Sequence, residues 1–136
     1  MLPKPEHLSL RLLLDEGVPD AVGRVFEERG HIVTFANKAL PRGSADQLVC
    51  VAALNAGAIL VAADHDMKSI AKANGVGNER FKALSPIKLS CRKPEAAAKV
   101  RQAMSLIEHE WLCDAANGRR RLWIEIQSSV IKIVRV

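Results

Sequence analysis

Several carboxylates stand at positions where they could gather around a metal ion. They are Asp15, Glu16, Asp46, Asp64 and Asp66. Carboxylates that lie close together repel one another and raise one another's pKa, and a divalent cation removes that cost. Hard oxygen ligands suit Mg²⁺ or Mn²⁺. Such an ion can lower the pKa of a bound water and stabilise charge on a phosphate group, so the chemistry that fits these residues is hydrolysis of a phosphodiester.

Each of these acids also has a simpler explanation. Asp46 is expected in the first turn of a helix, where an acid interacts well with the helix dipole in any case. Asp64 and Asp66 could cap the helix that follows them, but one acid would suffice for that, so the pair favours a functional role. Asp15 ends a buried strand, where a plain turn seldom needs an acid, and Glu16 is interpreted as its solvated, supporting neighbour.

The segments that would position these acids follow from the hydrophobic pattern. Strands are predicted at 9–14, 31–35 and 58–62, with a fourth centred on 87–89. Helices are predicted at 19–29, 45–56, 66–73 and 94–116, and residues 36–44 are predicted to form a long loop. The alternating stretches 121–127 and 130–136 indicate a C-terminal β-hairpin with one wet face. Alternation of strands and helices favours an α/β fold around a mostly parallel sheet.

In an α/β sheet of this kind, ligands bind beyond the carboxyl ends of the strands. The five acids all follow a strand or begin the next helix, so they are predicted to share one edge of the sheet. Lys38 and Arg42 belong to the same edge, and Lys68 lies in the helix after the third strand; these three are candidates for contacts with phosphate groups. Ser44 is expected to cap the helix that contains Asp46.

Composition narrows the class of protein and of partner. The chain has 136 residues, 49% of them hydrophobic, which suits a single domain over 1–136 with residues 1–8 as a loose N-terminal tail. A net charge of +5 favours an anionic partner such as nucleic acid. Two Trp, three Phe and no Tyr argue against an aromatic platform for single strands. Without an apolar signal core or a run of about 20 apolar residues, we expect a cytoplasmic protein that binds no membrane. Three widely spaced cysteines are interpreted as reduced core residues.

Taken in order, the motifs "LLLDEGVP", "ERGHIVTF", "GSADQLVCVAALNAGAILVAADHDM" and "IKIVRV" resemble those of the PIN-domain nucleases. They are most similar to small bacterial PIN-like proteins whose genes often lie beside an antitoxin gene. The resemblance implies a three-layer PIN-like fold with a central, mostly parallel sheet and a C-terminal hairpin. It also implies a Mg²⁺- or Mn²⁺-dependent endoribonuclease, with an RNA substrate and, in the toxin setting, an antitoxin protein or a second copy of the chain as partner.

By the same resemblance, the metal-site acids would be Asp15, Asp46, Asp64 and Asp66, with Glu16 in support. The chain departs from the family pattern at two positions. Ala62 replaces a hydroxyl residue, and Met67 replaces an aromatic residue. These departures leave open an alternative in which a PIN-like module binds RNA or a protein without cleaving it.

A third reading is a phosphoacceptor domain of the receiver type. "DHDM" is similar to the phospho-aspartate loop of such domains, and "RKPEAA" to their Lys-Pro sequence. The interval between Asp66 and Lys93 is too short for the additional strand and helix that a receiver domain contains, and a receiver does not end in an amphipathic hairpin. The sequence therefore favours the nuclease.

Overall fold

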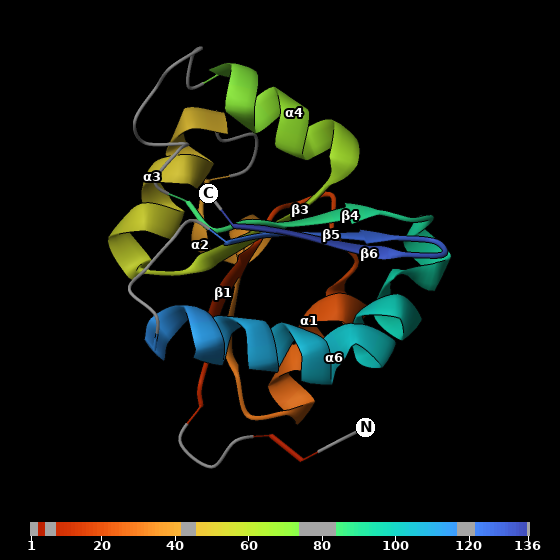
Figure 1. Ribbon diagram of the computed structural model, residues 1–136. Helices are drawn as coiled ribbons and strands as arrows, with labels where there is room; N and C mark the ends of the chain where they lie inside the picture. The colour runs from red at the N-terminus through yellow and green to blue at the C-terminus, as the bar shows by residue number, and fades with distance from the viewer. Residues whose placement is uncertain (1–2, 5–7, 42–45, 74–83, 117–121, 136) are drawn as a thin grey trace.

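The computed structural model describes residues 3–4, 8–41, 46–73, 84–116 and 122–135. Its strands are β1 (Arg11–Leu14), β2 (Ile32–Phe35), β3 (Ile59–Ala63), β4 (Ile87–Ser90), β5 (Leu122–Gln127) and β6 (Ile131–Arg135). Its helices are α1 (Asp20–Glu28), α2 (Ala36–Ala39), α3 (Asp46–Ala56), α4 (Asp64–Ala73) and α6 (Lys93–Ala116). Figure 1 shows the sheet between two helical layers, with α3 and α4 on one side and α1 and α6 on the other.

The strands form one sheet in the order β2-β1-β3-β4-β5-β6. The pairs β1–β2, β1–β3, β3–β4 and β4–β5 are parallel, and β5–β6 is the antiparallel hairpin. The predicted α/β class, the mostly parallel sheet and the C-terminal hairpin are therefore confirmed. Within the described ranges, no helix is long and apolar enough to cross a membrane.

Both faces of the sheet are packed, which explains the continuous apolar runs of the central strands. On one face, Phe26 of α1 and Ile107 of α6 are fully buried with the inward side chains of the strands, and we call this group the first core. On the other face, Leu60 of β3 packs with Cys50 of α3 and Ile70 of α4, in what we call the second core. Each such large apolar side chain contributes about 1.5–3 kcal/mol when fully buried.

The element boundaries differ from the predictions in two places that affect the site. The loop predicted at 36–44 begins as the short helix α2, because Ala36 is buried in the second core. Helix α4 begins at Asp64, two residues before the predicted start, so both acids of the pair lie in its first turn, next to the positive end of the helix dipole.

The end of α1, the N-terminal segment and the cysteines can also be compared with the sequence patterns. Gly30 follows α1 with φ 85°, which is the left-handed conformation expected of a glycine after a helix. Of the predicted tail, Leu8 packs against the first core, while residues 1–2 and 5–7 lie outside the described residues. Ser44 and Arg42 also lie outside them. Cys50 is buried, as predicted, whereas Cys91 and Cys113 are only partly buried, and none of the three forms a disulfide.

Candidate functional site

A cavity of about 370 Å³ opens at the carboxyl edge of the sheet, beyond the ends of β1 and β3. Its described lining residues are Asp15, Glu16, Gly17, Ala36, Leu40, Val49, Asp66 and Lys93. Carboxylates and one ammonium group form its polar wall, and α2 and α3 supply an apolar wall. The structure thus brings together the acids after β1 and the second acid of α4, as the parallel-strand rule predicts.

The backbone holds Asp15 at the mouth of β1. Its N–H donates to the carbonyl of Val61 in β3 at 2.9 Å, which continues the ladder one residue beyond Leu14. Its own carbonyl accepts a hydrogen bond from the N–H of Val18 at 3.0 Å, which closes a tight turn before α1. With both backbone groups satisfied, the position of Asp15 is fixed by the sheet and the turn together.

The carboxylate of Asp66 lies directly against the turn that follows β1. A Cβ atom built on Gly17 would collide with Oδ2 of Asp66 and lie 3.2 Å from its Cγ. The carboxylate can occupy this space only because residue 17 has no side chain. Gly17 therefore allows an acid from α4 to approach the Asp15–Glu16 turn closely.

Asp64 has a different environment from Asp66, although both are in the first turn of α4. Its Oδ1 is 2.9 Å from Nζ of Lys88 on β4, and its Oδ2 is 3.4 Å from Nζ of Lys68. The hydrogen bond from Lys88 holds the pKa of Asp64 below its ordinary value. Asp64 is not among the described lining residues of the cavity, so its proposed role as a metal ligand remains a prediction.

Lys88 is in turn placed between two carboxylates. Its Nζ lies 3.6 Å from Oε1 of Glu125 on β5, and the side chain is only 15% exposed. Burial alone would lower the pKa of Lys88, but the hydrogen bond to Asp64 and the charge of Glu125 outweigh it and raise the pKa. Lys88 therefore remains a cation that links α4 to the middle of the sheet.

Of the three residues predicted to contact phosphate, Lys38 and Lys68 can be placed in the structure. Lys38 lies with its Nζ 4.6 Å from the centre of the Phe35 ring and is not among the described lining residues. Lys68 is directed to Asp64. Asp46 begins α3 as predicted, but its side chain, like Arg42, lies outside what the structure describes.

Lys93 is a cavity residue that the sequence analysis did not assign to the site. It is exposed at the first position of α6, directly after β4. The signal was present, because Lys93 follows a parallel strand and so belongs to the same sheet edge as the acids. It was interpreted only as part of a Lys-Pro sequence.

The chemistry of the cavity can be compared with the needs of a metal ion. Among the described residues, no three His, Cys, Asp or Glu side chains converge closely enough to form a complete ligand set. Mg²⁺ does not require one, because it keeps several waters and is commonly bound through one or two carboxylates together with substrate phosphates. Asp15 and Asp66 provide hard oxygen donors in one cavity, so the residues present fit Mg²⁺ or Mn²⁺.

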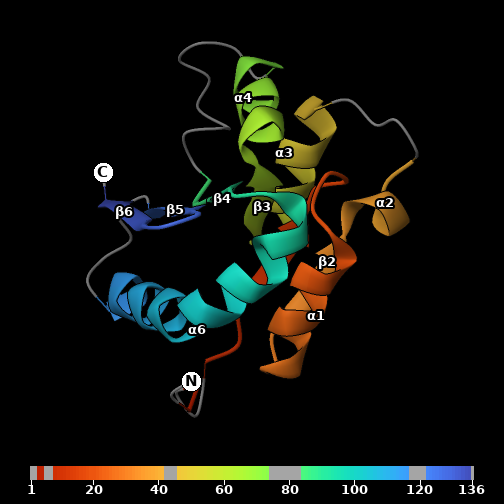
Figure 2. The same ribbon diagram turned by 90° about the vertical axis from the view of Figure 1, so that its right-hand side faces the viewer.

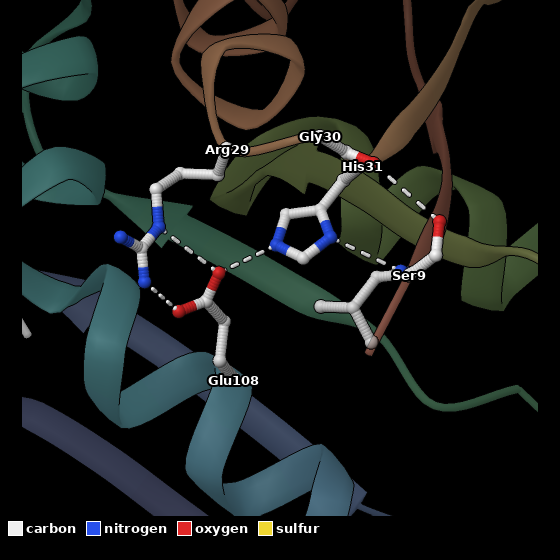
Figure 3. Close-up of polar contacts among 6 residues, drawn as sticks. Ser9, Arg29, Gly30, His31 and Glu108 are labelled. Carbon is white, nitrogen blue, oxygen red and sulfur yellow. Dashed lines mark hydrogen bonds and ion pairs between the residues drawn. The ribbon is translucent and has the colours of Figure 1, made fainter. Parts of the chain in front are cut away.

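A second polar cluster lies at the opposite edge of the sheet, where β2 begins (Figure 3). Nε2 of His31 lies 2.7 Å from Oε2 of Glu108 on α6, and both side chains are almost completely buried. The guanidinium group of Arg29 donates to both carboxylate oxygens of Glu108. Nδ1 of His31 accepts the N–H of Leu10 at 3.1 Å, so the proton of the neutral ring is on Nε2.

This cluster has a structural role. Arg29 ends α1, His31 precedes β2, and Glu108 lies in the middle of α6, so the carboxylate joins three elements at the edge away from the cavity. His31 is buried directly before β2. Its hydrogen-bond partner could not be predicted from local sequence, because Glu108 is 77 residues away along the chain.

No protein-family model, curated protein or solved structure matches the chain. The relation to PIN-domain nucleases therefore remains a resemblance of sequence motifs.

Proposed function

We propose that the protein is a Mg²⁺- or Mn²⁺-dependent endoribonuclease that hydrolyses RNA phosphodiesters at the carboxyl edge of its sheet. The observation that carries this proposal is one cavity lined by three acids and a lysine. Asp15 and Glu16 follow β1, Asp66 follows β3, and Lys93 follows β4. Clustered carboxylates suit a divalent metal ion, and the ammonium group of Lys93 beside them suits a phosphate group. The net charge of +5 favours association with a polyanion.

In the proposed mechanism, Asp15 and Asp66 would hold the metal ion, with Glu16 as a supporting acid in the same cavity. A bound ion would supply a more acidic water and stabilise charge on the phosphate. Lys93 binds a non-bridging phosphate oxygen and so orients the phosphodiester over the two carboxylates. Ala36, Leu40 and Val49 form the apolar part of the cavity wall.

The two departures from the PIN pattern leave the described cavity wall unchanged. Ala62 is fully buried in the second core, and Met67 is only 1% exposed there. Neither is among the described lining residues. Packing in the second core thus accounts for both residue types, and neither removes a described group from the cavity wall.

The motif resemblance extends the proposal to a biological setting. In it, the enzyme is the toxin half of a toxin–antitoxin pair and is held inactive by an antitoxin protein. Growth arrest on expression of the wild-type protein, and none with Asp66→Asn, is the outcome that this setting requires.

One observation favours a second candidate, the phosphoacceptor domain. Lys93 faces the same cavity as Asp66 and the Asp15–Glu16 pair, an arrangement that could hold an acyl phosphate. Incubation with acetyl phosphate, followed by intact-mass measurement, distinguishes the two functions. A stable gain of one phosphoryl group that Asp66→Asn abolishes would support the phosphoacceptor and count against the nuclease.

Metal binding and RNA cleavage should be measured together on matched variants. We expect Mn²⁺ binding by calorimetry, and cleavage of a fluorophore-labelled single-stranded RNA that EDTA abolishes. Asp66→Asn should remove both, whereas Asp64→Asn, two residues away and engaged by Lys88, should retain metal binding. Equal loss in the two variants would instead make Asp64 a ligand. A wild-type protein that neither binds Mn²⁺ nor cleaves RNA would end the proposal, provided that circular dichroism shows it to be folded.

A further inference from the structure

A second cavity, of about 220 Å³, lies on the sheet itself. It is lined by Lys88, Trp123, Glu125, Lys132 and Val134 from β4, β5 and β6. The strand register explains why these side chains meet. Lys88 pairs with Glu125 and Glu125 with Lys132, so they form one row across the sheet, and Trp123 pairs with Val134 in an adjacent row. We call this feature the Trp123 groove.

The groove lies on the face of the sheet that carries the second core. Lys88 is in register with Ala62, whose side chain is buried in that core, and Trp123 packs against its margin. Helices α3 and α4 pack mainly on β1, β3 and β4 on this face. Figure 2 shows the hairpin extending away from α3 and α4, with α6 on its other side. Lys132 is exposed, and Trp123 and Val134 are partly exposed, so the groove is open to solvent at the hairpin.

The groove combines the groups that bind a base of a single strand. The indole of Trp123 and the side chain of Val134 form an apolar wall on which a base can stack. Nζ of Lys88 lies 5.8 Å from the centre of the indole ring, and Lys132 is exposed at the outer end of the row. A cation beside an aromatic wall suits a nucleotide, because the base stacks while its phosphate pairs with the ammonium group.

Glu125 keeps this arrangement rigid. Its Oε2 accepts hydrogen bonds from Ser90 at 2.8 Å and from Gln127 at 3.1 Å, while its Oε1 faces Lys88. Burial alone would raise the pKa of Glu125, but these hydrogen bonds outweigh it and lower the pKa, so the group stays charged. The fixed carboxylate holds Lys88 next to the indole.

A chain of contacts joins the Trp123 groove to the acidic cavity. Lys88 lies beside Trp123 and donates to Asp64, and Asp64 shares the first turn of α4 with Asp66. The first turn of α4 therefore carries one acid of the cavity, Asp66, and one acid bound to a groove lysine, Asp64. We propose that the groove is a subsite for one base of single-stranded RNA, with Lys132 on its phosphate; this rests on the proposed nuclease function.

Intrinsic fluorescence can test the subsite without any cleavage. Trp111→Phe leaves Trp123 as the only indole, since the chain has two Trp residues. The probe is a short single-stranded oligoadenylate, titrated in EDTA so that metal-dependent cleavage does not contribute. We expect quenching of Trp123. The anisotropy of a fluorophore-labelled oligoadenylate should show an affinity that falls by about fivefold or more in Trp123→Leu, because one base–aromatic stack is worth at least that factor. Trp111→Leu, on α6 and the first core, is the matched control and should bind as wild type does.

A second variant keeps the test independent of packing. Lys132→Glu changes an exposed side chain and should weaken binding while the thermal midpoint remains near that of wild type. Absence of quenching, or equal affinity in wild type, Trp123→Leu and Lys132→Glu, would overturn the subsite. Binding in EDTA that depends on Trp123, with no cleavage in Mg²⁺ or Mn²⁺, would keep the subsite and remove the nuclease. Cleavage in Mg²⁺ or Mn²⁺, together with binding that does not depend on Trp123, would keep the nuclease and remove the subsite.

Discussion

Replacement of Glu108 by Gln tests the buried cluster at the edge of the sheet opposite the acidic cavity. The carboxylate is 1% exposed and accepts hydrogen bonds from Arg29 and from Nε2 of His31. Gln keeps one acceptor oxygen but removes the charge, and its NH₂ group faces at least one N–H donor. Breaking a buried ion pair costs about 3–5 kcal/mol. Because Arg29 is 14% exposed and can still reach water, we expect the lower end, about 3 kcal/mol.

The loss should be measured by urea unfolding, followed by circular dichroism. With a slope of about 2 kcal/mol per molar urea, a loss of about 3 kcal/mol lowers the midpoint by about 1.5 M. The matched control is Glu28→Gln. Glu28 also joins α1 to α6, through Arg101 at 3.1 Å, but both residues of this pair are more than half exposed. A surface pair of this kind contributes about 0–1 kcal/mol, so its midpoint should move by less than about 0.5 M.

Equal shifts in the two variants would refute the reasoning. They would mean that burial of Glu108 adds nothing to the link between α1 and α6. A small shift in Glu108→Gln, within that of Glu28→Gln, would have the same consequence.

Three other contacts have measurable consequences. Burial lowers the pKa of His31 from its ordinary 6.5, although Glu108 acts in the opposite direction. At a pH under 6.5, the unfolded chain therefore binds more protons than the folded protein. The free energy of unfolding should therefore be greatest above pH 6.5 and fall as the pH drops, and His31→Gln should flatten this slope in thermal melts across pH 5–8. Gly17→Ala should displace the Asp66 carboxylate and reduce RNA cleavage by about tenfold to hundredfold with little change in the melting midpoint; full activity would contradict the placement of Asp66. Lys88→Met removes the hydrogen bond that lowers the pKa of Asp64, so an NMR titration should find that pKa closer to its ordinary 3.8, whereas an unchanged value would exclude Lys88 as the cause.

The sequence predicted the strands of this fold well because their signal is local. Continuous apolar runs identified β1 and β3, and strict alternation identified the hairpin, each to within about two residues, which is the usual uncertainty of an element boundary. Helix α2 was missed because its four residues carry no periodic pattern, and it depends on burial of Ala36 in the second core. That burial is a tertiary effect, which no short window of sequence contains.

The candidate site depended on a boundary that the sequence placed two residues late. The sequence predicted that the helix starts at Asp66, which left Asp64 in a loop from which it could turn toward Asp15. Since α4 begins at Asp64, both acids are helical, and residues two apart on an α-helix point about 200° apart. Asp66 therefore lies against Gly17, and Asp64 faces Lys88. The edge of the sheet was predictable from strand order, but the helical phase decides which acid reaches the cavity.

Lys93 and the Trp123 groove depend on information of another kind, namely which strands are neighbours. Lys93 reaches the acidic cavity because β4 pairs with β3, and Trp123 meets Lys88 because β5 pairs with β4. The aromatic count argued against a platform for single strands, and one indole is indeed no platform. A single base, however, needs only one aromatic wall and a cation, and the sheet register supplies both from residues more than 30 positions apart. Composition limits how many bases a surface can stack, while topology determines whether any base can stack at all.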